Sequence, residues 1–509
     1  MTPTTLPPAL RGILLTDPDA LVPYATASGP FRATPQAVVR PRDTEGVVAA
    51  LAWARDRGMA VVARGAGTGM PGGNVGRGLA LDLSAFDATR SEPSGPGQVW
   101  AGAGATGAAI DAVARADGHF VPPLPSSAER CTVGGMVANN AAGARSFGYG
   151  SVRSWVEALD VVLADGTEVR LDRGAPPPPI FLDLLASLAP HEASIRAGWP
   201  DVRKNSSGYA LDRFLTHGSA VDLLVGSEGT LGIVTRVLLR LAPAPTSRHV
   251  VLLPVPSLED LPHAVEAVNQ ADAAACEFLG ARFLDVAGLR TGGDFGDTVG
   301  DAEALLMVEL DDRSHPPAHG RAILHALAKE FRRPLLEASD PARAAALWRV
   351  RHAASPAIAE RARGGLVSMQ FIEDSVVPPT ALPQYLRDLR SILDAEDTDA
   401  VIFGHAGDGN VHVNPLVDTR RSDWRERVHR ILSRTATLVA GLGGTLAGEH
   451  GDGRVRTPLG PVIWSRAAMD GFRTVKKTLD PTGCLNPGVV VPLSGQDPLE
   501  WLTAQGGRR

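Results

Sequence analysis

The apolar residues between positions 37 and 241 fall in short runs rich in Val, Leu and Ile, separated by glycine-rich turns. Runs of this length predict strands, here at residues 60–63, 80–83, 99–101, 157–163 and 168–171. Residues 44–57 differ, because their apolar side chains recur at helical spacing, and Thr44 is the expected N-cap. The pattern predicts an αβ domain in this part of the chain.

A second αβ pattern follows the proline-rich segment 241–245. Strands are expected at 250–253 and 304–310, and a long helix at about 342–361. A chain of 509 residues is too long for a single hydrophobic core. We therefore divide it into a lead-in (1–33), a first domain (34–243), a second domain (246–491) and a tail (492–509).

Two apolar segments near the end, 401–405 and 411–414, are joined by a turn of Gly, Asp and Asn, the composition of a β-hairpin. A hairpin would bring His405 near His412, and Asn414 would share the face of His412 because side chains alternate along a strand. A later glycine-flanked turn carries Glu449 and His450. Together these are the parts of a catalytic metal site with an open position. The alternative is that the histidines only cap turns or form local hydrogen bonds.

Composition excludes several classes of protein. The net charge is −6 and basic residues do not cluster, so a nucleic-acid partner is not expected. The three cysteines lie far apart without a Cys-x-x-Cys motif, which disfavours both a disulfide framework and an iron–sulfur cluster bound by this chain alone. We expect a cytoplasmic protein with no signal peptide and no membrane span, and peripheral contact with the inner membrane face stays open.

The segment 64–69 follows a predicted strand and invites comparison with a dinucleotide-binding loop. It fails that comparison, because Met70 stands where the third glycine belongs and Pro71 begins the next segment. Its exposed backbone N–H groups instead suit an anion-binding nest. Similar runs of small residues occur at 125–143 and 226–234. One such loop is more often a simple turn, but three in one domain indicate a ligand site.

These three runs resemble the flavin-binding domain of the vanillyl-alcohol-oxidase/PCMH-type flavoproteins. Residues 404–414, 448–451 and 486–488 resemble the C-terminal domain of FAD-linked oxidases in that superfamily. Together the motifs are similar to those of the D-2-hydroxyacid dehydrogenases, which act on D-lactate, D-2-hydroxyglutarate or glycolate. The resemblance implies an α+β fold: a PCMH-type FAD-binding domain of two αβ subdomains, followed by an αβ substrate (cap) domain.

The resemblance also implies FAD as cofactor. The family sometimes tethers FAD through a histidine in the first loop, but residues 64–73 contain none, so non-covalent FAD is expected. The cofactor-binding positions implied are Arg64, Gly65, Ala66, Gly67, Thr68, Gly69, Pro71, Gly72, Pro125, Ser126, Ser127, Thr132, Gly134, Gly135, Asn139, Gly143, Glu228, Gly229, Ile233 and Asn486.

For the reaction, the resemblance implies His405, His412 and Glu449 as ligands of a divalent metal, with zinc or manganese suited to them. His450 would take the proton of the substrate hydroxyl, with a pKa near the working pH, and the C2 hydride would pass to flavin N5. Asn414 would orient the substrate. Arg351 and Ser355, four residues apart on a helix, would bind its carboxylate. The alternative for Arg351 is a solvated charge on a helix surface.

One departure leaves the substrate open. Relatives acting on D-2-hydroxyglutarate often carry a lysine where this chain has Ile372. Two rivals remain: a related flavoprotein acting on an alcohol or an amino-sugar nucleotide, and a non-catalytic flavin subunit of an electron-transfer complex. The metal triad argues against the first, and the intact Glu449–His450 pair against the second. The electron acceptor would be a quinone, an electron-transfer protein or a separate iron–sulfur subunit, and a homodimer stays open.

Overall fold

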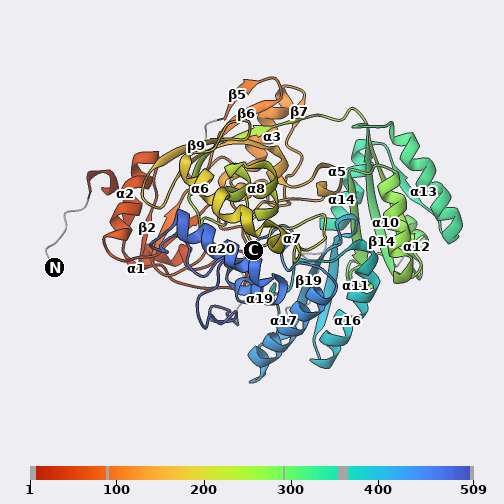
Figure 1. The fold of residues 1–509 in the computed structure, drawn as a ribbon. Helices are drawn as coiled ribbons and strands as arrows, with labels where there is room; N and C mark the ends of the chain where they lie inside the picture. The colour runs from red at the N-terminus through yellow and green to blue at the C-terminus, as the bar shows by residue number, and fades with distance from the viewer. Residues whose placement is uncertain (1–6, 88–90, 291–292, 353–364, 505–509) are drawn as a thin grey trace.

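The structure is a computed structural model that describes residues 7–87, 91–290, 293–352 and 365–504. Figure 1 shows an N-terminal half in red to yellow, a second half in green to cyan, and a blue C-terminal segment that runs back to the first half. Among the described residues, no helix is both long and apolar enough to span a bilayer.

The N-terminal half is built around mixed and antiparallel sheets. One sheet has the strand order β1 (Leu14–Leu15), β2 (Ala37–Val39), β4 (Leu79–Asp82), β3 (Val61–Arg64). A second has the order β5 (Ser91–Gly95), β6 (Gln98–Gly102), β10 (Ile233–Arg240), β8 (Val156–Val162), β9 (Glu168–Asp172), and β7 (His119–Phe120) pairs with β11 (Ala242–Pro243). The strands predicted in this half are therefore present. Because β1 pairs with β2, the lead-in belongs to the first sheet.

Helices alternate with these strands along the chain. They are α1 (Pro18–Leu21), α2 (Thr44–Arg55), α3 (Gly107–Ala116), α4 (Val133–Ala138), α5 (Ser146–Tyr149), α6 (Pro179–Leu188), α7 (Glu192–Arg196), α8 (Leu211–His217) and α9 (Ala220–Leu224). The N-cap of α2 is Asp43 and not Thr44, because the Asp43 carboxylate accepts a hydrogen bond of 2.8 Å from the backbone N–H of Gly46.

The second half is a large antiparallel sheet. Its order is β15 (Leu336–Ala338), β12 (Arg248–Val255), β14 (Ala304–Asp311), β13 (Ala275–Gly280), β18 (Asp399–His405), β19 (Asn410–Asp418), β16 (Leu366–Ser368), with β17 (Ser375–Val376) also paired to β19. One face packs on α10 (Leu261–Gln270), α13 (Pro317–Phe331), α16 (Leu382–Ala395) and α17 (Trp424–Gly441). The other packs on α11 (Ala281–Val286), α12 (Gly293–Val299) and α14 (Pro341–His352). Both faces of the central strands are therefore buried.

The end of the chain returns to the N-terminal half. After α18 (Gly453–Arg456) and α19 (Gly460–Ile463), helix α20 (Arg466–Leu479) buries Phe472 and Val475 in the same core as α6 and α8. Figure 1 shows α20 beside α6 and α8. Side chains between Trp464 and Val490, which the sequence division places in the second domain, thus contribute to the core of the N-terminal half. The tail also binds this half, since the N–H of Thr503 donates to the carbonyl of Pro30 at 2.9 Å.

Candidate functional site

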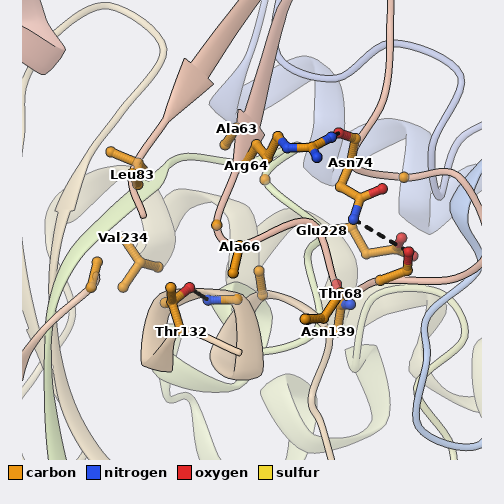
Figure 2. A pocket seen from close by; sticks show the side chains of 18 of the residues that line it. Ala63, Arg64, Ala66, Thr68, Asn74, Leu83, Thr132, Asn139, Glu228 and Val234 are labelled. Carbon is orange, nitrogen blue, oxygen red and sulfur yellow. Dashed lines mark hydrogen bonds between the residues drawn. The ribbon is translucent and has the colours of Figure 1, made fainter. Parts of the chain in front are cut away.

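A pocket lined mainly by residues of the N-terminal half also includes His450 from the other half. Figure 2 shows its walls, with Ala66, Thr132 and Asn139 drawn around it. The predicted cofactor positions on its lining are Arg64, Gly65, Ala66, Gly67, Thr68, Gly69, Pro71, Thr132, Gly134, Gly135, Asn139, Glu228, Gly229 and Ile233. Gly72, Pro125, Ser126, Ser127, Gly143 and Asn486 are not on it.

Two of the positions off the lining have other contacts. A Cβ at Gly143 would lie 2.1 Å from the carbonyl oxygen of Leu124, so this glycine permits close packing of two backbone segments. The side-chain amide of Asn486 donates to the backbone carbonyls of Gly73 and Glu228, at 2.8 and 2.9 Å. Asn486 therefore supports the cavity wall from behind.

The loop 65–69 has the properties of an anion-binding segment. Within the described chain, its five backbone N–H groups donate to no protein acceptor. Gly67 has a φ of +73°, and a Cβ at Gly65 would lie 2.3 Å from Thr132 Oγ1. The guanidinium of Arg64 is not free to bind a ligand, because it donates to the backbone carbonyls of Thr26 and Asn74. The free amides fit the pyrophosphate of a bound dinucleotide such as FAD.

At the His450 end of the cavity, the predicted hairpin is present as β18 and β19. His405 pairs with Asn410 and Phe403 with His412, so both histidines lie on one face of the hairpin. Their Nε2 atoms are 3.2 Å apart. Asn414 lies two residues beyond His412 on the same strand and is also buried. The predicted approach of His405 and His412 is confirmed.

Glu449 completes a set of three buried donor atoms. Its Oε1 lies 3.4 Å from His405 Nε2 and 3.3 Å from His412 Nε2. Ligands about 2.0–2.1 Å from a zinc ion lie ~3.4 Å apart at tetrahedral angles. The geometry and the donor types, two imidazoles and one carboxylate, therefore fit a divalent metal.

The far side of each donor is fixed by a further contact. His405 Nδ1 bonds to the carboxylate of Glu277, and His412 Nδ1 lies 2.9 Å from the backbone carbonyl of Glu373. Both contacts leave Nε2 directed at Glu449. Glu449 Oε2 accepts a bond of 2.6 Å from Lys204. Although burial opposes ionisation, Lys204 and His405 hold the pKa of Glu449 well below its usual range.

His450 lies beside this set. Its Nδ1 is 2.7 Å from Glu373 Oε2, and its Nε2 is 3.4 Å from Glu449 Oε1. Burial alone would lower the pKa of His450, but the carboxylates of Glu373 and Asp374 outweigh it and raise that pKa to about 10. The expected pKa near the working pH is therefore not found for the protein without a metal.

The loop that carries Glu449 and His450 is held through its own backbone. The N–H groups of Glu449 and His450 donate to Asp374 Oδ2 at 2.9 and 2.8 Å. That of Gly451 donates to Ser206 Oγ, and those of the next two residues donate to the carboxylate of Glu228. Acceptors from remote segments thus fix five consecutive amides.

The predicted substrate residues fall in different places. Arg351 is not a solvated charge, because its side chain is 12% exposed, packs on the ring of Phe403 and donates through Nε to Glu277 at 2.6 Å. Ser355 lies outside the described residues. Ile372 is buried in the hydrophobic core.

Sequence patterns did not single out Glu277, Glu373, Asp374 or Lys204 as site residues. For Glu277 a signal existed, since a glutamate within the apolar run 273–279 must be paired when buried. The partners themselves come from distant segments, and spacing along the chain does not reveal them.

Comparisons with known proteins now add to this geometry. Residues 35–172 match the FAD binding domain family, and residues 244–490 match the family described as FAD linked oxidases, C-terminal domain. The chain is 31% identical over 456 residues to a D-lactate dehydrogenase of Archaeoglobus fulgidus, covering 89% of this chain and 91% of the relative. This protein belongs to the FAD-linked oxidases.

Other relatives of this FAD-linked oxidase carry related names. It is 29% identical to glycolate oxidase subunit GlcD of Bacillus subtilis, with 91% of this chain and 90% of the relative covered. It is also 29% identical to a D-2-hydroxyglutarate dehydrogenase of Xanthomonas citri pv. viticola, with 94% of each covered. A 4-ethylphenol oxidase structure from Gulosibacter chungangensis superposes with a TM-score of 0.68 at 16% identity over 95% of each chain, which supports the fold alone.

Proposed function

We propose that this FAD-linked oxidase converts a D-2-hydroxyacid to the 2-oxoacid, using non-covalent FAD and a divalent metal held by His405, His412 and Glu449. One observation carries the proposal: three metal-type donor atoms lie 3.2–3.4 Å apart beside His450, which lines the cavity suited to FAD. The names of the relatives, D-lactate dehydrogenase, glycolate oxidase subunit and D-2-hydroxyglutarate dehydrogenase, support the substrate class.

When bound, FAD supplies the two-electron acceptor, and the metal supplies a Lewis acid for the substrate hydroxyl and positive charge that opposes protonation of His450. His450 accepts the hydroxyl proton at Nε2, because Glu373 holds its Nδ1. Glu373 and Asp374 then stabilise the imidazolium that forms. These residues thus leave Nε2 as the ring nitrogen that can accept the proton.

Arg351 is proposed to bind the substrate carboxylate. Among the described residues, the hydrogen bond from Arg351 to a carboxylate uses Nε. Its two Nη atoms form a fork that suits the carboxylate of the substrate. Asn414, on the same strand as His412, would orient the substrate. Ile372 offers no cation for a distal carboxylate, which favours a monocarboxylate such as D-lactate over D-2-hydroxyglutarate.

Anaerobic bleaching of the flavin by a panel of D- and L-2-hydroxyacids tests this proposal. D-lactate should bleach the enzyme faster than L-lactate and D-2-hydroxyglutarate. Treatment with a chelator should abolish turnover while FAD stays bound, and Zn²⁺ or Mn²⁺ should restore it. Full turnover in a verified metal-free preparation would refute the metal site. Flavin that stays with the protein after acid precipitation would refute non-covalent binding.

A further inference from the structure

The two carboxylate oxygens of Glu449 have different partners. Oε1 faces His405 and His412, as described above, whereas Oε2 lies 2.6 Å from the ammonium of Lys204. Lys204 is only 4% exposed, and Glu449 is 8% exposed. In this buried setting the ammonium of Lys204 binds Oε2 of Glu449, and Oε1 is left for the candidate metal.

The choice of lysine at this position is informative. Only four of the 50 basic residues of the chain are lysines, namely Lys204, Lys329, Lys476 and Lys477. A planar guanidinium tends to bind both oxygens of a carboxylate, whereas an ammonium is a compact charge that can bind one. A chain that uses arginine almost everywhere else thus has lysine where a single oxygen must be held.

Lys204 is also fixed in place by its neighbours. It comes from the segment between the two family matches, which end at residue 172 and begin again at residue 244. The N–H of Ser206 donates to the carbonyl of Ala447 at 2.8 Å, and the N–H of Gly208 donates to Asp452 Oδ2 at 2.8 Å. These bonds attach the segment to the loop on both sides of Glu449, so the lysine is held against this carboxylate.

We propose that Lys204 is a positioning residue that restricts Glu449 to single-oxygen coordination of the metal, which keeps coordination positions open for the substrate. The inference rests on the proposed function above. Carboxylates bind divalent ions through one or both oxygens. A second oxygen from Glu449 would take a position that the hydroxyl or carboxylate of a 2-hydroxyacid needs.

This role predicts effects of opposite sign on metal and substrate. Replacing Lys204 with Met removes a nearby positive charge and frees Oε2, so the ion should be held more tightly. The same change should weaken substrate binding, because fewer coordination positions remain. If Lys204 only supported the fold, replacing it would weaken metal binding and substrate binding together.

The test compares wild type and K204M as FAD-loaded enzymes. Competition with a chromophoric chelator gives the Zn²⁺ dissociation constant, and steady-state assays give KM and kcat for D-lactate. We expect a lower Zn²⁺ dissociation constant, a KM raised about 10–100-fold, and a smaller change in kcat. In Co²⁺-substituted protein, the d–d absorption should weaken in K204M because the coordination number increases.

A higher Zn²⁺ dissociation constant in K204M, or a Co²⁺ spectrum equal to that of wild type, overturns the inference. If K204M does not fold, K204Q serves instead: it removes the charge but keeps a neutral donor, and should change the metal and substrate affinities in the same directions by smaller factors. R203M is the matched control, because Arg203 bonds Asn269 and the carbonyl of Phe147 and not Glu449. It should leave both constants unchanged.

The same experiments separate this inference from the proposed function. A wild-type enzyme that turns over D-lactate without any bound ion refutes the proposed function before the variants are compared. If wild type requires the ion and K204M has the same metal and substrate affinities as wild type, only the role of Lys204 is overturned.

Discussion

Glu277 connects two parts of the candidate site that lie far apart in the sequence. One carboxylate oxygen bonds to His405 Nδ1 and the other accepts from Arg351 Nε. Burial opposes ionisation of this side chain, but the cationic partners His405 and Arg351 lower its pKa to about 2. The same carboxylate therefore orients a candidate metal ligand and a candidate substrate contact.

Replacing Glu277 with Gln should weaken the site at both ends. Loss of the charge reduces the basicity of His405 and releases Arg351, so Zn²⁺ affinity or turnover should fall about 10–100-fold. Chelator competition and the KM for D-lactate measure the two effects. Glu309→Gln is the control, because Glu309 is also a buried glutamate of this sheet, and among the described residues it bonds Arg145 and Trp348 and not the candidate metal or substrate residues. Unchanged Zn²⁺ affinity in the Glu277 variant contradicts this role.

His450 should make the stability of the metal-free protein depend on pH. Its pKa is raised to about 10 in the fold, against about 6.5 when unfolded, so the folded state holds the proton more tightly. The resulting stabilisation is complete below about pH 6.5 and is lost as the pH rises through about 10. The Tm of wild type should therefore be higher than that of His450→Gln near pH 6, and this difference should be smaller near pH 10.

Thermal unfolding of chelator-treated protein measures this difference. Comparing the two proteins at each pH removes the effect of the titrating groups that do not interact with position 450. Although burial opposes it, His450 lowers the pKa of Glu373, and that pKa therefore differs between them. A Tm difference that is equal at both ends of the pH range would show that the charge on His450 does not stabilise the fold.

At the scale of elements, the loop 448–453 is ordered by contacts to its backbone and not by regular structure. Its amides bind Asp374, Ser206 and Glu228, which come from three separate segments. A loop held in this way keeps Glu449 and His450 in place even though neither belongs to a helix or strand.

Asp374→Ala should loosen that loop. It leaves two amides without their acceptor, which costs about 1–3 kcal/mol of unfolding free energy. Because His450 then loses its fixed position, anaerobic flavin reduction by D-lactate should also slow. Asp43→Ala is the control, since it removes the cap of α2 at a cost of about 1 kcal/mol but touches nothing in the site. Normal flavin reduction in the Asp374 variant would contradict the proposed support of His450.

The sequence predicted the elements better than the contacts between them. Strands such as β8 and β14 are long apolar runs, so periodicity located them to within about two residues. The hairpin of β18 and β19 followed from its turn composition. Contacts such as Lys204–Glu449 join residues from different halves, and their pairing depends on tertiary packing that no local pattern encodes.

At the scale of the molecule, the N-terminal core is completed by the end of the chain. The Phe472 ring packs on Trp464 and Tyr209, and the hydroxyl of Tyr209 is 2.7 Å from Thr230 Oγ1. Thr230 follows Gly229, which lines the cavity. The core that α20 joins could not be predicted from the sequence, since a helical pattern specifies burial without naming the partner.

Phe472→Ala should therefore act on the flavin site as well as on stability. Removing a buried phenylalanine costs about 3–5 kcal/mol, and the wall near Gly229 should relax, so FAD should dissociate more readily. Phe283→Ala in the second half is the matched control, because Phe283 is equally buried but packs in a different core. Calorimetry and FAD titration should show similar losses of stability but weaker FAD binding in the Phe472 variant alone. Equal FAD affinity in both variants contradicts the coupling.

The return of α20 also affects how the chain can fold during synthesis. The ribosome delivers the N-terminal half first, yet its core lacks α20 and Leu485 until residues 466–485 have been made. Most domains complete their folding as they emerge, in order from the N-terminus. Here the nascent first half keeps part of its apolar surface exposed until α20 has been synthesised. Chaperones that bind exposed apolar surfaces should therefore improve the yield of folded protein.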